Sequence, residues 1–302
     1  MPDQVRHDNE RSFCEGVNSK SKDNNQAEKV SNPEKGLSMY LDYWDFKKAP
    51  FENVADPSFF YVSQSHEEAL SRLLYVARFS KGAALLTGDI GSGKSLISRV
   101  YKNKLKEAGS DIIILTNPHY NPVEFLQIIV YQLGIADRPD SKARLLQMLG
   151  RKAIKNLEHS KGTIIVIDEA QGIPEDTLEE ARLLLNLQNG HRFLLTLVLI
   201  GQPELRKKIK DMKSLDQRIP IRFHLRPFDF RDTQNYIMYR LKRAGLENNV
   251  FEKKAIKKIY EHTEGLPREI NSVCDLSLLI GCNRKKKYIT PGIVASVVDD
   301  ME

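Results

Sequence analysis

Residues 88–95 read Gly-Asp-Ile-Gly-Ser-Gly-Lys-Ser and directly follow an apolar run, Ala-Ala-Leu-Leu-Thr, at residues 83–87. This is the P-loop (Walker A) pattern, in which glycines let the backbone turn tightly enough for its N–H groups to point at phosphate oxygens. In such a loop Lys94 reaches the β- and γ-phosphates, and the Ser95 hydroxyl coordinates Mg²⁺. A helix expected over about 94–106 adds the positive end of its dipole to the same anion. We therefore predict a nucleoside triphosphate site formed by Gly88, Asp89, Ile90, Gly91, Ser92, Gly93, Lys94 and Ser95.

A second pattern stands at residues 163–171, where the β-branched run Thr-Ile-Ile-Val-Ile ends in Asp-Glu-Ala-Gln. A continuous apolar run of this kind is typical of a strand buried on both faces of a parallel sheet. Asp168 at its end would hold Mg²⁺, directly or through water, and Glu169 would polarise the attacking water. Taken alone, the two carboxylates could equally be a solvated strand end. Paired with a P-loop, they predict hydrolysis of the nucleotide.

The composition favours a cytoplasmic enzyme. With 302 residues and 41% hydrophobic content, the chain can bury one large core and a smaller second one. Its apolar stretches are too short to span a bilayer, and its polar N-terminus has no hydrophobic signal-peptide region. Cys14, Cys274 and Cys282 have no metal or redox spacing, so we expect neither zinc nor disulfides. The last two fall in a helical pattern and are expected to be core thiols.

The chain divides into three regions by pattern. Residues 1–36 are rich in Asn, Asp, Glu, Lys and Ser and are expected to be a disordered tail. Residues 37–228 alternate strands and helices, whereas residues 229–302 show only helical spacing and predict a separate helical lid. The expected strands are 83–87, 111–116, 163–167, 193–200 and a short one near 222–225.

Strand–helix alternation with a P-loop after the first strand predicts an α/β fold, a doubly wound, mainly parallel five-stranded sheet, with the all-helical lid added at its C-terminal side. Two helix starts can be named from their capping residues. Ser65 and Glu68 form a capping-box pattern, and Asn121-Pro122 supplies a cap followed by proline in the first turn.

Six short segments occur in one order along the chain. They are Met-Tyr-Leu through Phe at 39–46, Pro-Phe at 50–51, Asp-Pro-Ser-Phe at 56–59, Ser-His-Glu-Glu-Ala-Leu at 65–70, Leu-Ile-Gly-Gln-Pro-Glu-Leu at 199–205 and Gly-Leu-Pro-Arg-Glu-Ile-Asn at 265–271. With the two-part plan, they resemble the AAA+ ATPases, and among these the ExeA/GspA family of general secretion pathway component A. That family is related to the transposition regulators of the TnsC and MuB type.

The resemblance implies ATP as the nucleotide, Mg²⁺ as its metal, and roles for three further residues. Gln202 would be the sensor that orients the attacking water, with a simple turn residue before Pro203 as the alternative. Arg268 would contact the γ-phosphate and couple the lid to the nucleotide state, with a solvated surface arginine as the alternative. Pro267 would pack near the adenine.

The resemblance also implies an arginine finger, a residue that acts on the nucleotide of a neighbouring subunit in a homo-oligomer. The segment Asp-Gln-Arg-Ile at 216–219 stands where this superfamily carries one. Arg218 is the first candidate and Arg222 the second, and a plain basic face is the alternative for both.

Three functions remain open at the level of sequence. The first is a secretion-type ATPase that drives assembly of a larger machine; because longer family members continue into a transmembrane helix and a peptidoglycan-binding module, membrane work would need a protein partner. The second is a DNA-associated regulator of the transposition type, compatible with a pI near 9.0 and with basic clusters at 206–213 and 284–287, which are otherwise ordinary solvated faces. The third is a nucleotide switch that does not hydrolyse.

Overall fold

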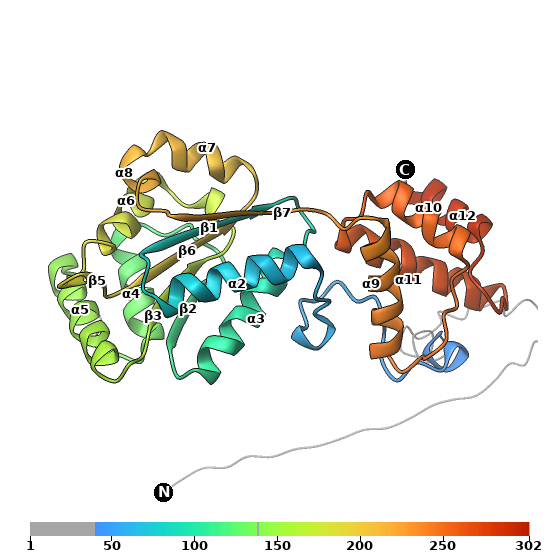
Figure 1. The fold of residues 1–302 in the computed structure, drawn as a ribbon, viewed down its shortest axis with the longest axis horizontal. Helices are drawn as coiled ribbons and strands as arrows, with labels where there is room; N and C mark the ends of the chain where they lie inside the picture. The colour runs from blue at the N-terminus through green and yellow to red at the C-terminus, as the bar shows by residue number, and fades with distance from the viewer. Residues whose placement is uncertain (1–39, 138, 302) are drawn as a thin grey trace, which may run out of the picture.

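A parallel sheet of five strands forms the centre of the chain (Figure 1). The computed structural model describes residues 40–137 and 139–301. Every neighbouring pair in the sheet is parallel, so all five strands end at the same edge. The order is β2-β3-β6-β1-β7, and the strands are β1 (Ala83–Gly88), β2 (Asp111–Leu115), β3 (Thr163–Ile167), β6 (Thr196–Gly201) and β7 (Ile221–Leu225).

The strands are buried on both faces because their apolar side chains alternate between two separate cores. Along β1, Leu85 packs into one core and Leu86 into the other, and β3 and β6 divide their side chains in the same way. One core lies under α2 (Gln64–Arg78) and α3 (Lys94–Glu107). The other lies under α4 (Pro122–Gln132), α5 (Lys142–Glu158), α6 (Glu175–Leu184), α7 (Glu204–Asp211) and α8 (Lys213–Asp216). The predicted doubly wound sheet is confirmed.

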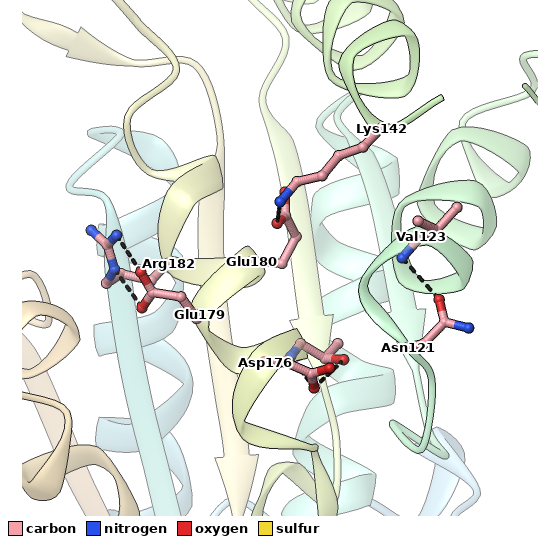
Figure 2. A network of polar contacts seen from close by, with 8 residues as sticks. Asn121, Val123, Lys142, Asp176, Glu179, Glu180 and Arg182 are labelled. Atoms are coloured by element: carbon pink, nitrogen blue, oxygen red, sulfur yellow. Dashed lines mark hydrogen bonds and ion pairs between the residues drawn. The ribbon is translucent and has the colours of Figure 1, made fainter. Parts of the chain in front are cut away.

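Polar contacts hold α4, α5 and α6 in place on the face of the sheet that they cover (Figure 2). Asn121 caps α4 by accepting from the N–H groups of Val123 and Glu124, each at 3.0 Å, which confirms this predicted helix start. The buried carboxylate of Glu180 on α6 pairs with Lys142 at the start of α5, and this ion pair joins the two helices across the gap between them.

Two local predictions were wrong. Helix α2 begins at Gln64, and its cap is Ser63, whose hydroxyl accepts from the His66 N–H, so the predicted cap at Ser65 lies inside the helix. The predicted strand 193–200 is shorter, because Arg192–Phe193 (β5) pairs antiparallel with Gln188–Asn189 (β4) as a small hairpin. The chain must turn between this hairpin and the sheet, so β6 starts at Thr196.

Four helices pack together beside the sheet: α9 (Phe230–Arg243), α10 (Lys253–Thr263), α11 (Pro267–Asn283) and α12 (Pro291–Met301) (Figure 1). Their core also takes in Tyr40, Trp44 and Phe51 from the N-terminal side, and the Trp44 indole donates to the Leu278 carbonyl at 3.0 Å. Cys274 and Cys282 are buried there, as predicted.

Two short 3₁₀ turns complete the described elements, η1 (Pro57–Phe59) and η2 (Ala170–Gly172). The domain boundaries 37–228 and 229–302 stay a proposal, and the tail 1–36 with Cys14 lies outside the described residues. Within the part of the chain that the structure describes, no helix has both the length and the apolar character to cross a membrane.

Candidate functional site

The P-loop joins the end of β1 to the start of α3 and depends on glycine at two positions. Gly91 and Gly93 have φ of +82° and +97°, in the left-handed region that favours glycine. A Cβ on Gly91 would lie 2.7 Å from Cβ of Arg268, and one on Gly93 would lie 2.9 Å from Nε2 of His66. Conformation and space together therefore exclude a side chain at either position, and the loop presents its backbone at the N-terminus of α3.

His66 holds this loop in place through its ring nitrogens, and this role was not predicted from the sequence. Its Nε2 lies 3.2 Å from the Ser92 carbonyl oxygen, and its Nδ1 lies 2.8 Å from the Ser63 hydroxyl. Burial lowers the pKa of His66 to about 4, so the ring is neutral at neutral pH. A neutral ring serves both contacts when Nε2–H donates to Ser92 and Nδ1 accepts from Ser63.

Lys94 lies folded along the loop, nearly buried at 5% exposure. Its ammonium donates to the carbonyl oxygens of Gly88 at 2.8 Å and Asp89 at 2.7 Å. Burial lowers the pKa of Lys94, and the nearby carboxylates of Glu169 and Asp168 act in the opposite direction. The cation is thus fixed beside the N–H groups that bind phosphate in this motif.

Ser95 and Asp168, the predicted metal ligands, lie close together. The Glu169 N–H donates to Oδ1 of Asp168 at 3.1 Å. Burial raises the pKa of Asp168, and hydrogen bonding from the Ser95 side chain and the Glu169 backbone opposes the rise. A hydroxyl beside a carboxylate is a hard-oxygen donor set that fits Mg²⁺, which takes its other ligands from water and phosphate. Across residues 40–137 and 139–301, no group of three or more His, Cys, Asp or Glu could hold a metal.

Glu169 is the second residue after β3 and has φ of +55°. The side-chain amide of Gln171 donates to its Oε2 at 2.6 Å, and the Gln202 amide approaches the same oxygen at 3.5 Å. The structure thus brings the predicted base and the predicted sensor together. It also adds Gln171, which sequence reasoning quoted within the motif but gave no role.

A cavity of about 450 Å³ opens between the P-loop and the C-terminal helices. Helix α11 reaches the loop directly, because the Arg268 N–H donates to the Gly91 carbonyl at 3.2 Å. The predicted site residues that line this cavity are Ile90, Gly91, Gly93, Lys94, Ser95, Glu169, Gln202, Pro267 and Arg268.

The opposite wall was missed by sequence reasoning. It is formed by Glu52, Asn53, Val54, Ala55, Tyr236, Arg240 and Asn271. Arg240 is buried, and its guanidinium donates to the carbonyl oxygens of Pro50 and Glu52 and to the Tyr236 hydroxyl. It also lies 4.4 Å from the ring centre of Phe59. Arg240 therefore ties segment 50–55 to α9. Three segments that carry the resemblance gave a signal for this wall: 50–51 and 56–59 flank it, and 265–271 contains Asn271.

A family model described as an AAA domain matches residues 77–209. General secretion pathway protein A (GspA) of Aeromonas hydrophila is 32% identical over 260 residues, which is 85% of this chain and 47% of that protein. The chain belongs to the GspA family of AAA+ proteins. The ATP-dependent target DNA activator B of Escherichia phage Mu is 26% identical over 52% of this chain and 48% of that protein. The chain thus spans about half the length of these two curated relatives.

Solved AAA+ structures share the fold of this GspA-family chain. The Aeropyrum pernix ORC2 protein, described in ADPNP–ADP complexes, has a TM-score of 0.62 at 17% identity, over 84% of this chain and 72% of that one. The Thermotoga maritima RuvB branch migration motor has a TM-score of 0.54 at 16% identity, over 79% of this chain and 69% of that one. At these identities the likeness concerns the fold alone, and it agrees with the predicted sheet and helical region.

The two finger candidates of this GspA-family chain are not among the residues that line this cavity. Arg222 pairs with the Asp216 carboxylate at 2.7 Å and also donates to the Asp216 carbonyl at 2.6 Å. Arg218 is half-buried just before β7. Their action on a neighbouring subunit stays a prediction.

Arg240→Ala is expected to destabilise the GspA-family fold by about 2–4 kcal/mol, because two backbone carbonyls and a buried hydroxyl lose their donor. Urea unfolding measures this, with Lys242→Ala as the matched control. Lys242 lies two residues further along α9, is exposed, and forms an ion pair with the exposed Glu247 at 3.4 Å, so its loss should cost no more than about 0.5 kcal/mol. Equal midpoints for the two variants would contradict the role given to Arg240.

Proposed function

We propose that this chain binds ATP with Mg²⁺, hydrolyses it, and couples its nucleotide state to the assembly of a larger machine. One observation carries the proposal: Lys94, the Ser95–Asp168 pair and Glu169 lie together at the edge where β1 and β3 end. A cation, a hard-oxygen metal site and a carboxylate at the N-terminus of a helix are the components of phosphoryl transfer to water. Membership of the GspA family supports the same conclusion.

Each of these residues would have a separate task. The backbone of Gly88–Ser95 would bind the triphosphate, and Lys94 would offset the charge of its β- and γ-phosphates. Ser95 and Asp168 would hold Mg²⁺, which when bound neutralises phosphate charge. Glu169 would orient the attacking water and take its proton, and Gln202 would help to aim that water.

The lid is proposed to sense the nucleotide through α11. The hydrogen bond from the Arg268 N–H to the Gly91 carbonyl joins the first turn of that helix to the P-loop. Movement of the loop around phosphate would therefore reach α11, while the Arg268 side chain would contact the γ-phosphate and Pro267 would pack near the adenine.

The active form is proposed to be a homo-oligomer in which Arg218, or Arg222 as the second candidate, acts on the nucleotide of a neighbouring subunit. Its proposed partner is a protein of a secretion or membrane machine.

A second candidate function is a DNA-associated regulator, favoured by the relative named as a target DNA activator of phage Mu. In the basic cluster at 206–213, Lys207 and Lys210 are exposed and could contact phosphates, whereas the guanidinium of the exposed Arg206 donates to the Thr87 hydroxyl at 3.0 Å. Lys208 instead donates to the Gln171 and Ile173 carbonyl oxygens, so it supports the loop after β3. The third reading, a switch without hydrolysis, would leave Glu169 without a task.

The concentration dependence of ATP hydrolysis tests this proposal. We expect turnover per subunit to rise several-fold as the protein concentration increases, because an arginine from one subunit must reach the site of another. Arg218→Ala should abolish this rise, and Lys213→Ala, an exposed basic residue nearby, should leave it intact. Turnover that is the same at every concentration would remove Arg218 from the mechanism.

Duplex DNA separates the candidate functions in the same assay. For an assembly ATPase of the secretion type, added DNA should leave turnover unchanged. Stimulation by DNA, with binding that weakens steeply as salt rises, would favour the regulator. Tight ATP binding with no turnover, in the presence or absence of DNA, would favour the third candidate, a nucleotide switch that does not hydrolyse ATP.

A further inference from the structure

Gln171 uses both ends of its side-chain amide within the site. It lies in η2, two residues after Glu169. Its Nε2 donates to Oε2 of Glu169 at 2.6 Å, while its Oε1 accepts from the backbone N–H of Gln202 at 3.1 Å. The Gln202 side chain approaches the same Glu169 oxygen at 3.5 Å. Glu169, Gln171 and Gln202 thus form a closed ring of polar contacts that joins the end of β3 to the end of β6.

The surrounding backbone leaves room for this ring and holds it in place. Gly201 lacks the side chain that would collide with it, since a Cβ there would lie 2.5 Å from Oε1 of Gln171 and 2.8 Å from Cδ2 of Leu205. Glu169 has the left-handed φ of +55°, which costs a non-glycine residue energy and persists only where neighbours hold it. The Gly172 N–H bond to the Glu169 carbonyl and the Lys208 bond to the Gln171 carbonyl fix the turn itself.

An amide is well suited to hold a catalytic carboxylate. It donates to one carboxylate oxygen with a group that does not titrate, so it orients the base without accepting the proton that the base must take. Its other end simultaneously fixes the backbone of Gln202, so the base and the sensor keep one relative position. Orientation of this kind contributes strongly to rate, and a displacement of about 1 Å can cost about 100-fold.

We propose that Gln171 is a positioning residue that holds Glu169 and Gln202 in one arrangement for water attack. This inference rests on the proposed ATP hydrolysis and deepens it, because a third residue, Gln171, would orient the base Glu169. The prediction is that changes to the amide reduce turnover while ATP affinity, which depends on the P-loop, stays nearly constant.

Two variants of Gln171 test the two ends of its amide. Gln171→Met keeps the length of the side chain and removes both hydrogen bonds, and we expect kcat to fall about 10- to 100-fold with the Kd for ATP changed less than about threefold. Gln171→Glu retains an acceptor for the Gln202 N–H but has no amide to donate to Glu169 and faces it with a like charge. We expect its kcat to fall about 10- to 100-fold as well, with the Kd for ATP changed less than about threefold.

Gln64→Met is the matched control, because Gln64 is an exposed glutamine at the start of α2 and does not line the cavity at the P-loop. It should match the unmodified protein in kcat and Kd, and thermal unfolding of all variants establishes that each is folded. Unchanged kcat in Gln171→Met or Gln171→Glu, or a rise in kcat in either, would overturn the proposal for Gln171 alone. Absence of ATP turnover in the unmodified protein would overturn the proposed function and this inference together.

Discussion

Lys94→Ala is expected to abolish measurable ATP binding, with the Kd raised at least about 100-fold. A hydrogen bond to a charged group contributes about 1.5–3 kcal/mol, and each 1.4 kcal/mol is tenfold in affinity. The ammonium of Lys94 also has four carboxylates acting on it, those of Glu169, Asp168, Asp89 and Glu204. Without the cation, these negative groups would face the negative triphosphate, so the variant loses an attraction and gains a repulsion.

Isothermal titration with ATP and Mg²⁺ measures this effect. The matched control is Lys104→Ala, which removes the same charge from the exposed far end of the same helix, α3. Lys104→Ala should bind ATP as the unmodified protein does. If Lys94→Ala still binds within about threefold of the unmodified protein, the nucleotide is held elsewhere and the proposed site is wrong.

The parts of the site that were predictable lie where one local pattern determines the structure. The strand at 163–167 could be predicted because an unbroken β-branched run can be satisfied only by burial on both faces, and its end then fixes Asp168 and Glu169 at the sheet edge. The P-loop is likewise specified by its own residues, since Gly91 and Gly93 adopt a backbone that other residues disfavour.

Sequence pattern alone was insufficient where the first residue of a helix or strand depends on packing. Ser63 and Ser65 both precede the apolar positions of α2, and the contact of His66 with Ser63 and the P-loop selects the earlier start. Similarly, the apolar residues before Thr196 continue a strand-like run in sequence, yet Phe193 pairs with the β4 hairpin strand.

The remaining site residues are fixed by contacts between segments far apart in the chain. Arg240 meets Pro50 and Glu52 only because α9 folds against the N-terminal segment. Gln171 meets the Gln202 backbone because β3 and β6 are neighbours in the sheet, an order that chain sequence does not reveal. These partners have no signature in composition or spacing, and the three-dimensional structure was needed to find them.

Glu169→Gln is expected to preserve ATP binding and to reduce kcat about 100- to 10,000-fold, the range contributed by a general base. The substitution keeps the shape of the side chain and one oxygen that can accept from Gln171 and Gln202, so the ring around it should survive. What it removes is the ability to take a proton from water. Phosphate release under saturating ATP measures kcat, and titration with ATP measures the unchanged affinity.

Glu175→Gln is the control for this prediction, because Glu175 is an exposed glutamate six residues further along and should tolerate the same change without effect. Comparison with Lys94→Ala then separates two steps in one site: the lysine variant fails to bind, whereas the Glu169 variant binds and does not turn over. A Glu169→Gln variant with full turnover would remove the residue from the chemistry. The carboxylate ring would then be a structural support for the end of β3, and the attacking water would require a different base.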